Sequence, residues 1–197
     1  MLQNRVDPLG RLIRTPARGA WMGNRGLLHN EQREIVRPFR LKAWLICVLE
    51  FKGRKRTVMT PNRYTELFFL DEATAFAAGH RPCFECRREA AQHFRQCWVR
   101  GNPDHAFTEN TSIDAIDAVI HKERMGAPYT ARIGELADGV FVLYSGEPYL
   151  VARGSLYSWS PFGYGEVVTL PADTALPVLT PRSTVNAFRQ GYIPQIA

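Results

Sequence analysis

Two cysteines stand two residues apart, directly after a turn and directly before a segment with helical spacing. Cys83 and Cys86 follow the turn from Gly79 to Pro82, and apolar residues then recur at helical intervals up to Gly101. A C-x-x-C pair at the start of a helix lets both sulfurs converge on one metal ion, and the helix N-terminus favours thiolates. The sequence therefore predicts a turn and a helix that share half of a metal site.

Strand and helix patterns alternate along the rest of the chain. Residues 43–51 are apolar on both faces, which is typical of a central strand. Asp71 is expected to cap a short helix, and the spacing predicts further helices at 112–125 and 181–190. Short β-type runs within 139–170, separated by Gly, Pro and Ser, indicate an antiparallel meander. We predict an α+β fold with a small antiparallel sheet, helices around the C-x-x-C turn and a C-terminal β-meander.

Three parts of the chain differ in character. Residues 1–42 are rich in Gly, Arg and Pro, and we expect an irregular basic arm followed by a first strand. Residues 43–110 carry the C-x-x-C pair, and residues 111–197 carry a helix and the meander. No linker-like stretch separates these parts, and 197 residues suit one domain, so we expect one compact unit.

Basic residues are concentrated in the N-terminal half. Residues 1–100 hold 19 Lys and Arg against 9 Asp and Glu, and 21 of the 25 basic residues of the chain are Arg. Guanidinium groups suit bidentate contacts to phosphate, so this half predicts a DNA or RNA partner. The predicted phosphate-binding residues are Lys52, Arg54, Lys55, Arg56, Arg81, Arg87 and Arg88. The alternative is that the arginines only solvate the surface.

The stretch around the cysteine pair resembles a known family. Over about residues 43–100 the chain resembles the zinc-binding N-terminal domain of the Ada alkylation-response protein. The matching segments are AAGHRPC at 77–83 and CRRE at 86–89, which follow a predicted short Ala-rich helix. The resemblance implies an α+β module whose zinc site uses two cysteine pairs. It also implies contacts to DNA phosphates and methyl transfer to one cysteine of the first pair.

The first cysteine pair of that family is absent here. Counted back from Cys83 without gaps, Lys52 and Arg56 occupy its positions, including that of the methyl acceptor. Neither residue is an ordinary zinc ligand, so we expect no methyl transfer and a zinc site built from other residues. The candidate ligands are Cys83, Cys86, His80 and Cys47, with His93 further along the helix. The alternative is that these cysteines are small core residues without a metal.

A metal-dependent hydrolase or deaminase that acts on a nucleobase or nucleic acid is the alternative function. P-C-x-x-C is half of the zinc-deaminase signature, and His29–Glu31 matches the H-x-E half. Cys83, Cys86 and a histidine would then bind the metal, and Glu31 or Glu123 would be the general acid or base. The helix preceding Pro82 argues against this hypothesis, because a deaminase has a strand there.

Asp114, Asp117 and His121 share one face of the helix predicted at 112–125. Carboxylates beside an imidazole can bind a metal or exchange protons. The alternative is a solvated face with an Asp117–His121 pair inside the helix.

The chain is expected to be cytoplasmic and to avoid membranes. Its longest nearly apolar stretch, residues 43–51, is far shorter than the roughly 20 residues that a membrane span needs. The N-terminus shows no signal-peptide core, and four cysteines are too few for a disulfide scaffold. The oligomeric state stays open.

Overall fold

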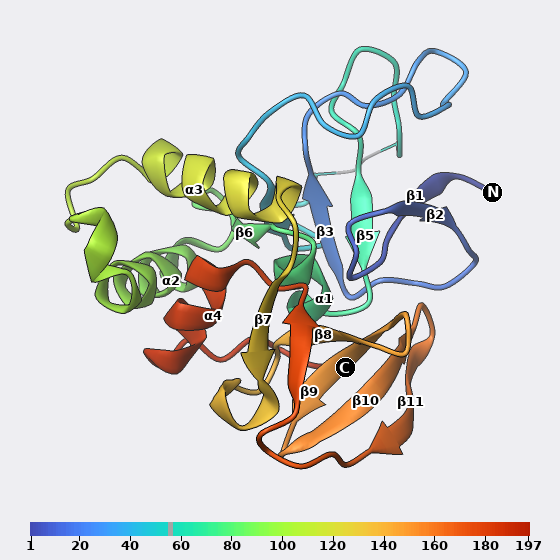
Figure 1. The fold of residues 1–197 in the computed structure, drawn as a ribbon. Helices are drawn as coiled ribbons and strands as arrows, with labels where there is room; N and C mark the ends of the chain where they lie inside the picture. Colours follow the sequence, from blue (N-terminus) through green and yellow to red (C-terminus); the bar gives the residue numbers. More distant parts are fainter. Residues whose placement is uncertain (55–56) are drawn as a thin grey trace.

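The computed structural model of the protein describes residues 1–54 and 57–197. These residues form two six-stranded sheets and four α-helices, so the predicted α+β class is confirmed (Figure 1). The first sheet is built from the N-terminal half of the chain. The second sheet is built from strands within residues 129–178.

The first sheet is mixed, with the strand order β2-β1-β5-β3-β4-β6. Its strands are β1 (Gln3–Val6), β2 (Leu12–Arg14), β3 (Trp21–Asn24), β4 (Leu45–Cys47), β5 (Leu67–Phe69) and β6 (Arg81–Pro82). The sequence predicts a small antiparallel sheet, whereas β1 pairs with β5 and β4 pairs with β6 in parallel. Parallel pairs need long connections, which local patterns do not reveal. The β4–β6 pair brings the C-x-x-C turn beside β4.

Residues 1–42 are more regular than the expected arm with one strand. Three strands of three or four residues each, β1 to β3, lie in this part of the chain. Such short strands, separated by Gly and Pro, contain too few residues to display a period of two. The indole nitrogen of Trp21 donates to the side-chain oxygen of Gln195 over 2.8 Å, which ties this part to the C-terminus.

The second sheet has the strand order β11-β10-β9-β8-β12-β7. Its strands are β7 (Tyr129–Arg132), β8 (Phe141–Tyr144), β9 (Glu147–Ala152), β10 (Ser155–Ser160), β11 (Gly163–Val168) and β12 (Ala175–Val178). Strands β8 to β11 pair consecutively and antiparallel. The turns at Ser145–Gly146 and Arg153–Gly154 have both residues at positive φ, which matches the twist of a two-residue hairpin.

Three of the four helices begin within one residue of the predicted position, whereas the helix expected to start at the cysteine pair begins at Arg88, two residues after Cys86. The four helices are α1 (Glu72–Ala77), α2 (Arg88–Gly101), α3 (Ile113–Met125) and α4 (Arg182–Arg189), and two short 3-10 turns lie at η1 (Pro103–His105) and η2 (Ile133–Glu135). The Asp71 carboxylate accepts from the backbone N–H of Thr74 over 2.8 Å and caps α1. Helix α4 begins one residue later than predicted, because Pro181 is its N-cap.

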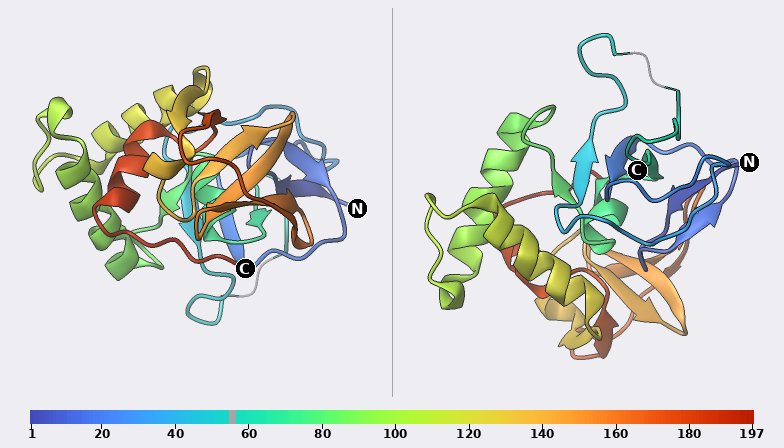
Figure 2. Two further views of the ribbon diagram at one scale, coloured as in Figure 1. Left: turned by 60° about the horizontal axis from the view of Figure 1, so that its bottom comes forward. Right: turned by 90° about the horizontal axis from the view of Figure 1, so that it is seen from above.

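Helix α1 is buried along its whole length and joins the two sheets, because it contacts both β5 and β8. Its Ala73 belongs to an apolar cluster with Phe141 of β8. On another face, the Phe76 ring lies 5.2 Å from the rings of Phe94 in α2 and Phe188 in α4. Figure 2 shows α2, α3 and α4 grouped on one side of the two sheets. The core therefore runs continuously from the sheets into the helices.

A three-cysteine candidate metal centre

Three cysteines meet where β4 and β6 end. Cys47 is the last residue of β4, and Cys83 follows β6 directly. The parallel pairing places Pro82 opposite Ile46, and the N–H of Cys83 donates to the carbonyl of Ile46 over 3.0 Å. The sulfurs of Cys47, Cys83 and Cys86 all lie within 4.8 Å of one another. A cysteine that is distant in sequence therefore joins the C-x-x-C pair.

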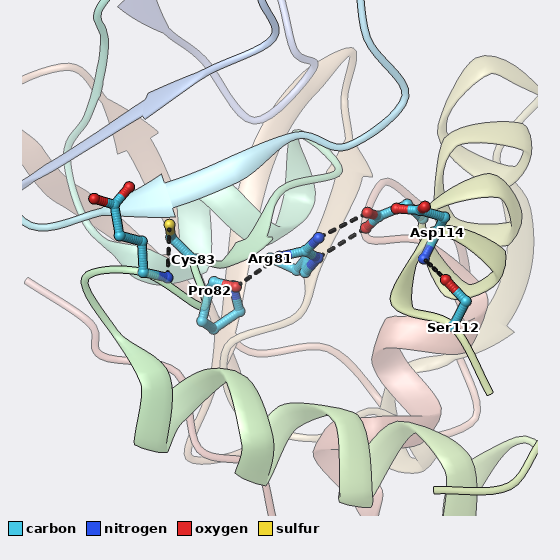
Figure 3. A network of polar contacts seen from close by, with 7 residues as sticks. Arg81, Pro82, Cys83, Ser112 and Asp114 are labelled. Carbon is cyan, nitrogen blue, oxygen red and sulfur yellow. Dashed lines mark hydrogen bonds and ion pairs between the residues drawn. The ribbon is translucent and has the colours of Figure 1, made fainter. Parts of the chain in front are cut away.

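The turn after Cys83 directs backbone N–H groups at its sulfur. The N–H of Glu85 donates to the Cys83 sulfur over 3.4 Å, which is the dashed line at Cys83 in Figure 3. The N–H of Arg87 donates to the carbonyl of Cys83 over 2.9 Å and closes the turn. Helix α2 begins one residue later, at Arg88. The turn thus stabilises a negatively charged sulfur before the helix starts.

The three thiols have unequal acidity. A hydrogen bond from the Cys47 thiol, with help from the backbone N–H groups of Cys86 and Glu85, lowers the pKa of Cys83 to about 5 against the opposing effect of burial. The same hydrogen bond and burial raise the pKa of Cys47. Burial also raises the pKa of Cys86. Of the three sulfurs, that of Cys83 is therefore the one that the surroundings favour as a thiolate, and a metal ion that binds the cysteines displaces the protons of those that are still thiols.

The donor set and its surroundings suit a soft metal ion. Cys47 and Cys83 are each 7% exposed, Cys86 is partly buried, and Met22 packs against them. Three thiolates favour zinc, copper(I) or an iron–sulfur cluster over hard cations. In the described part of the chain, no His, Asp or Glu joins this group. A tetrahedral zinc ion would therefore have three protein ligands and one position for an outside ligand.

Two of the arginines predicted to bind phosphate are engaged inside the protein. Arg81 is 5% exposed, and its Nε and Nη2 atoms donate to the Asp117 carboxylate over 2.8 and 2.7 Å (Figure 3). Arg87 forms an ion pair with Glu72 over 2.7 Å, and its guanidinium lies 4.0 Å from the centre of the Trp21 ring. Both guanidiniums hold elements of the fold together rather than face solvent.

The other predicted cations lie on the outside. Lys52, Arg54 and Arg88 are exposed, whereas Lys55 and Arg56 lie outside the described residues. Arg54 forms an ion pair with Glu85 over 2.8 Å, and this pair links the segment after β4 to the C-x-x-C turn. Because both side chains are more than half exposed, at 51% and 61%, the pair adds little to stability.

The two histidines proposed as ligands do not belong to the three-cysteine group. His80 is fully buried, with its ring 5.3 Å from that of Trp44 and 4.6 Å from that of Phe69. Its Nε2 accepts from the Nε of Arg25 over 3.2 Å. His93, on α2, lies with its Nε2 3.8 Å from the Cys97 sulfur. A local H-x-x-C spacing does not fix which way a buried histidine points.

The H-x-E motif of the alternative hypothesis is divided between core and surface. His29 is buried, and its two ring nitrogens contact the hydroxyl of Thr65 at 2.6 Å and the carbonyl of Thr60 at 3.2 Å. Glu31 is exposed. The Glu123 carboxylate accepts from the N–H and the hydroxyl of Ser183 over 3.1 and 2.6 Å, so it caps the start of α4. Each of these groups has a structural partner or lies in solvent.

The predicted polar face of α3 is divided in the same way. Asp117 is buried against Arg81, whereas Asp114 is exposed. The His121 ring packs edge-on against the rings of Phe39 and Trp44, at 4.7 and 5.3 Å. The face therefore consists of separate contacts to the first sheet and to the segment before β4.

The structure also contains a basic cavity that no pattern in the sequence predicts. Its volume is about 670 Å³, and Arg25 and Arg124 are among its lining residues. These arginines come from segments far apart in the chain, so spacing carries no signal for them. The one local hint is the pair of glycines next to Asn24–Arg25, which indicates a close backbone approach.

Comparisons of the chain with protein-family models, with curated proteins and with solved structures gave no match. The longest α-helix, α2, has 14 residues, and no helix in the described ranges combines the length and apolarity that crossing a membrane requires.

Proposed function

We propose that the protein is a nucleic-acid-binding protein with a zinc centre formed by Cys47, Cys83 and Cys86. The observation that carries the proposal is the convergence of the three sulfurs within 4.8 Å of one another. Zinc fits this centre because it accepts three thiolates and tolerates a variable fourth ligand. The centre ties β4 to the start of α2 and so stabilises the surface that carries the exposed cations.

The resemblance to the Ada zinc domain supports the same proposal. In that family a zinc module contacts DNA phosphates. Here the matching segments AAGHRPC and CRRE contain two of the three clustered cysteines, Cys83 and Cys86. We include no methyl transfer, since Lys52 and Arg56 occupy the positions of the first cysteine pair. In this proposal Cys47, earlier in the chain, takes over as the third ligand.

The surface proposed to bind nucleic acid consists of the exposed Lys52, Arg54 and Arg88. The proposal also includes Lys55 and Arg56, which follow Arg54 directly in the sequence. The positive charge and the positions of these residues support the proposal. Three of them follow one another at 54–56, and Arg88 is the first residue of α2, directly after the C-x-x-C turn. Phosphate contacts of this kind are sequence-independent and weaken strongly as salt is added. Arg81 and Arg87 support the surface from within.

Metal analysis tests the zinc centre. The purified protein is expected to hold one zinc ion per chain, measured by elemental mass spectrometry, and Cys47→Ser and Cys83→Ser are each expected to remove it. Cys97→Ser is the matched control, because Cys97 is also buried but lies on α2 with its sulfur 3.4 Å from the Gln190 carbonyl. A chain that binds no zinc after reconstitution, or that keeps full zinc in Cys47→Ser, overturns the zinc centre.

A binding titration tests the nucleic-acid surface. Labelled single- and double-stranded DNA and RNA are titrated at about 50 and 200 mM salt, where several phosphate contacts predict a loss of affinity of two or more orders of magnitude. Replacing Lys52, Arg54 and Arg88 together by Ala is expected to abolish binding while the zinc content stays the same. Binding that survives this change, or that does not respond to salt, overturns the proposed surface.

A further inference from the structure

A cavity of about 670 Å³ lies between the β1–β2 turn, residues 35–39, Trp44 and the end of α3. Four arginines line it, and none of the described residues that line it is acidic. The arginines are Arg11, Arg25, Arg37 and Arg124. A concave site of this size with a single sign of charge attracts an anion of small-molecule dimensions.

Arg25 is the most constrained of the four arginines. It is 2% exposed, and its guanidinium lies 4.0 Å from the centre of the Trp44 ring. Its Nε donates to His80 over 3.2 Å and its Nη1 donates to the carbonyl of Gly10 over 2.9 Å. Within residues 1–54 and 57–197, its buried Nη2 has no hydrogen-bond partner. A buried guanidinium with an unused donor is costly unless a ligand accepts that hydrogen bond.

Arg124 comes to the same place from the end of α3. A Cβ on Gly10 would lie 2.6 Å from its Nη2, and a Cβ on Gly79 would lie 2.8 Å from its Cγ, so the side chain runs along two glycines. Its Nε is also buried without a hydrogen-bond partner among the described residues. The absence of side chains at Gly10 and Gly79 thus leaves room for Arg124, close to the Gly10 carbonyl that accepts a hydrogen bond from Arg25.

The two guanidiniums repel each other. Burial, and then the positive charge of Arg124, lower the pKa of Arg25 to about 9, and Asp7 opposes this shift only in part. The Asp7 carboxylate already accepts from the Nε of Arg11 over 2.6 Å. An anion in the cavity beside Arg25 and Arg124 would relieve this repulsion.

We propose that this cavity binds the phosphate group of a small phosphate ester of about mononucleotide size. Arg25 and Arg124 would contact the phosphate oxygens from inside, and the exposed Arg37 would close the contact at the mouth. None of the three belongs to the cysteine centre or to the proposed nucleic-acid surface. The cavity and the proposed function therefore stand or fall separately.

Calorimetric titration of the intact protein tests the cavity with three probes: inorganic phosphate, a nucleoside 5′-monophosphate and the same nucleoside without phosphate. The monophosphate is expected to bind at least about tenfold more tightly than the nucleoside, since only it can accept from the two guanidiniums. Arg124→Met and Arg37→Ala are each expected to lower the affinity for the monophosphate by about tenfold or more. Arg132→Ala, an exposed arginine on β7, controls for the lost charge.

A glycine pair supplies a second test that keeps every arginine. Gly10→Ala places a methyl group against the Arg124 guanidinium and is expected to lower the affinity for the monophosphate. Gly146→Ala is the control and is expected to leave that affinity unchanged. Both glycines have positive φ, at 77° and 84°, but Gly146 has no neighbouring heavy atom within 4 Å of a Cβ. Both variants therefore carry the strain of a positive φ, and Gly10→Ala in addition displaces the Arg124 guanidinium.

Four results would overturn the proposal. One is the absence of binding by both inorganic phosphate and the monophosphate, and another is equal affinity for the monophosphate and the nucleoside. The third is unchanged affinity in folded Arg124→Met, Arg37→Ala and Gly10→Ala, with circular dichroism used to verify folding. A 5′-phosphorylated and a 5′-hydroxyl oligonucleotide complete the set, because binding by the phosphorylated strand alone, with none by the mononucleotide, would overturn a small-molecule ligand.

Discussion

Arg81 and Asp117 form a buried bidentate ion pair that joins the first sheet to α3, with N–O distances of 2.8 and 2.7 Å. Arg81 is also opposite Leu45 in the β4–β6 pair, two residues before Cys83. The pair therefore fixes the strand that delivers Cys83 to the three-cysteine centre.

Asp117→Asn is expected to destabilise the protein strongly. It leaves the Arg81 guanidinium buried without a countercharge, and breaking a buried pair in this way costs about 3–5 kcal/mol. Urea unfolding followed by circular dichroism measures the loss. Asp114→Asn, on the same helix but exposed, is the control and is expected to change stability by less than about 1 kcal/mol. Equal effects of the two variants would contradict the role assigned to the pair.

The neighbours Arg87 and Arg88 are expected to separate stability from binding. Arg87→Ala removes the ion pair with Glu72 and the packing on Trp21, so unfolding free energy should fall by about 3 kcal/mol. Arg88→Ala should leave stability within about 0.5 kcal/mol, weaken nucleic-acid binding and reduce the salt slope by about one. Denaturation and salt-dependent titration of both variants measure this. Binding that depends on Arg87 but not on Arg88 would contradict it.

Local signals predicted the helices, and long-range pairing placed the site. Asp71 caps α1 as the sequence predicts, because a capping bond links residues only two or three apart. In the structure Ser112 caps α3, at the first residue of the helix predicted at 112–125. The position of Cys47 beside Cys83 depends instead on a parallel strand pair, which no local pattern encodes. From the sequence, Cys47 is a candidate ligand because it is a cysteine in a strand expected to neighbour the turn. Only the fold shows that its sulfur converges with the other two.

Charge patterns were the least informative part of the sequence. Arg81 and Arg87 look like surface cations beside Arg88, yet both find carboxylates that lie elsewhere in the chain. The sequence marks Arg25 only through the neighbouring Gly23 and Gly26, although Arg25 is the most deeply buried arginine of the cavity. An arginine in the sequence does not indicate whether its partner is solvent, phosphate or a buried acid.

Glu123→Ala is expected to loosen the start of α4. The N-cap Pro181 makes no side-chain cap, and Glu123 supplies the missing acceptor from α3 to the N–H of Ser183. Loss of such a cap costs about 1–2 kcal/mol. Thermal unfolding and hydrogen exchange of the α4 amides measure it, with Lys122→Ala as an exposed control on α3. Unchanged exchange in α4 would show that Glu123 does not cap the helix.

The buried His80 is expected to make the protein less stable in mild acid. Burial, and then the positive charge of Arg25, hold the pKa of His80 well below its usual value of 6.5. Below about pH 6.5 His80 is therefore protonated in the unfolded chain but stays neutral in the folded chain, so folding stability falls as the pH drops. The loss approaches about 1.4 kcal/mol per pH unit until the folded-state pKa is reached. The pKa of His121 is lowered as well, mainly by burial, and adds in the same direction.

His80→Gln separates this contribution from the rest of the acid response. The variant is expected to be less stable than the natural chain at pH 7.5, because the ring packs against Trp44 and Phe69, yet its stability should fall less steeply between pH 6.5 and 5. Urea midpoints at half-unit pH intervals measure both slopes. His105→Gln, an exposed site, is the control and should keep the slope of the natural chain. A His80→Gln slope as steep as that of the natural chain would mean that His80 takes up its proton without unfolding, and its contact with Arg25 would then have to rearrange in acid.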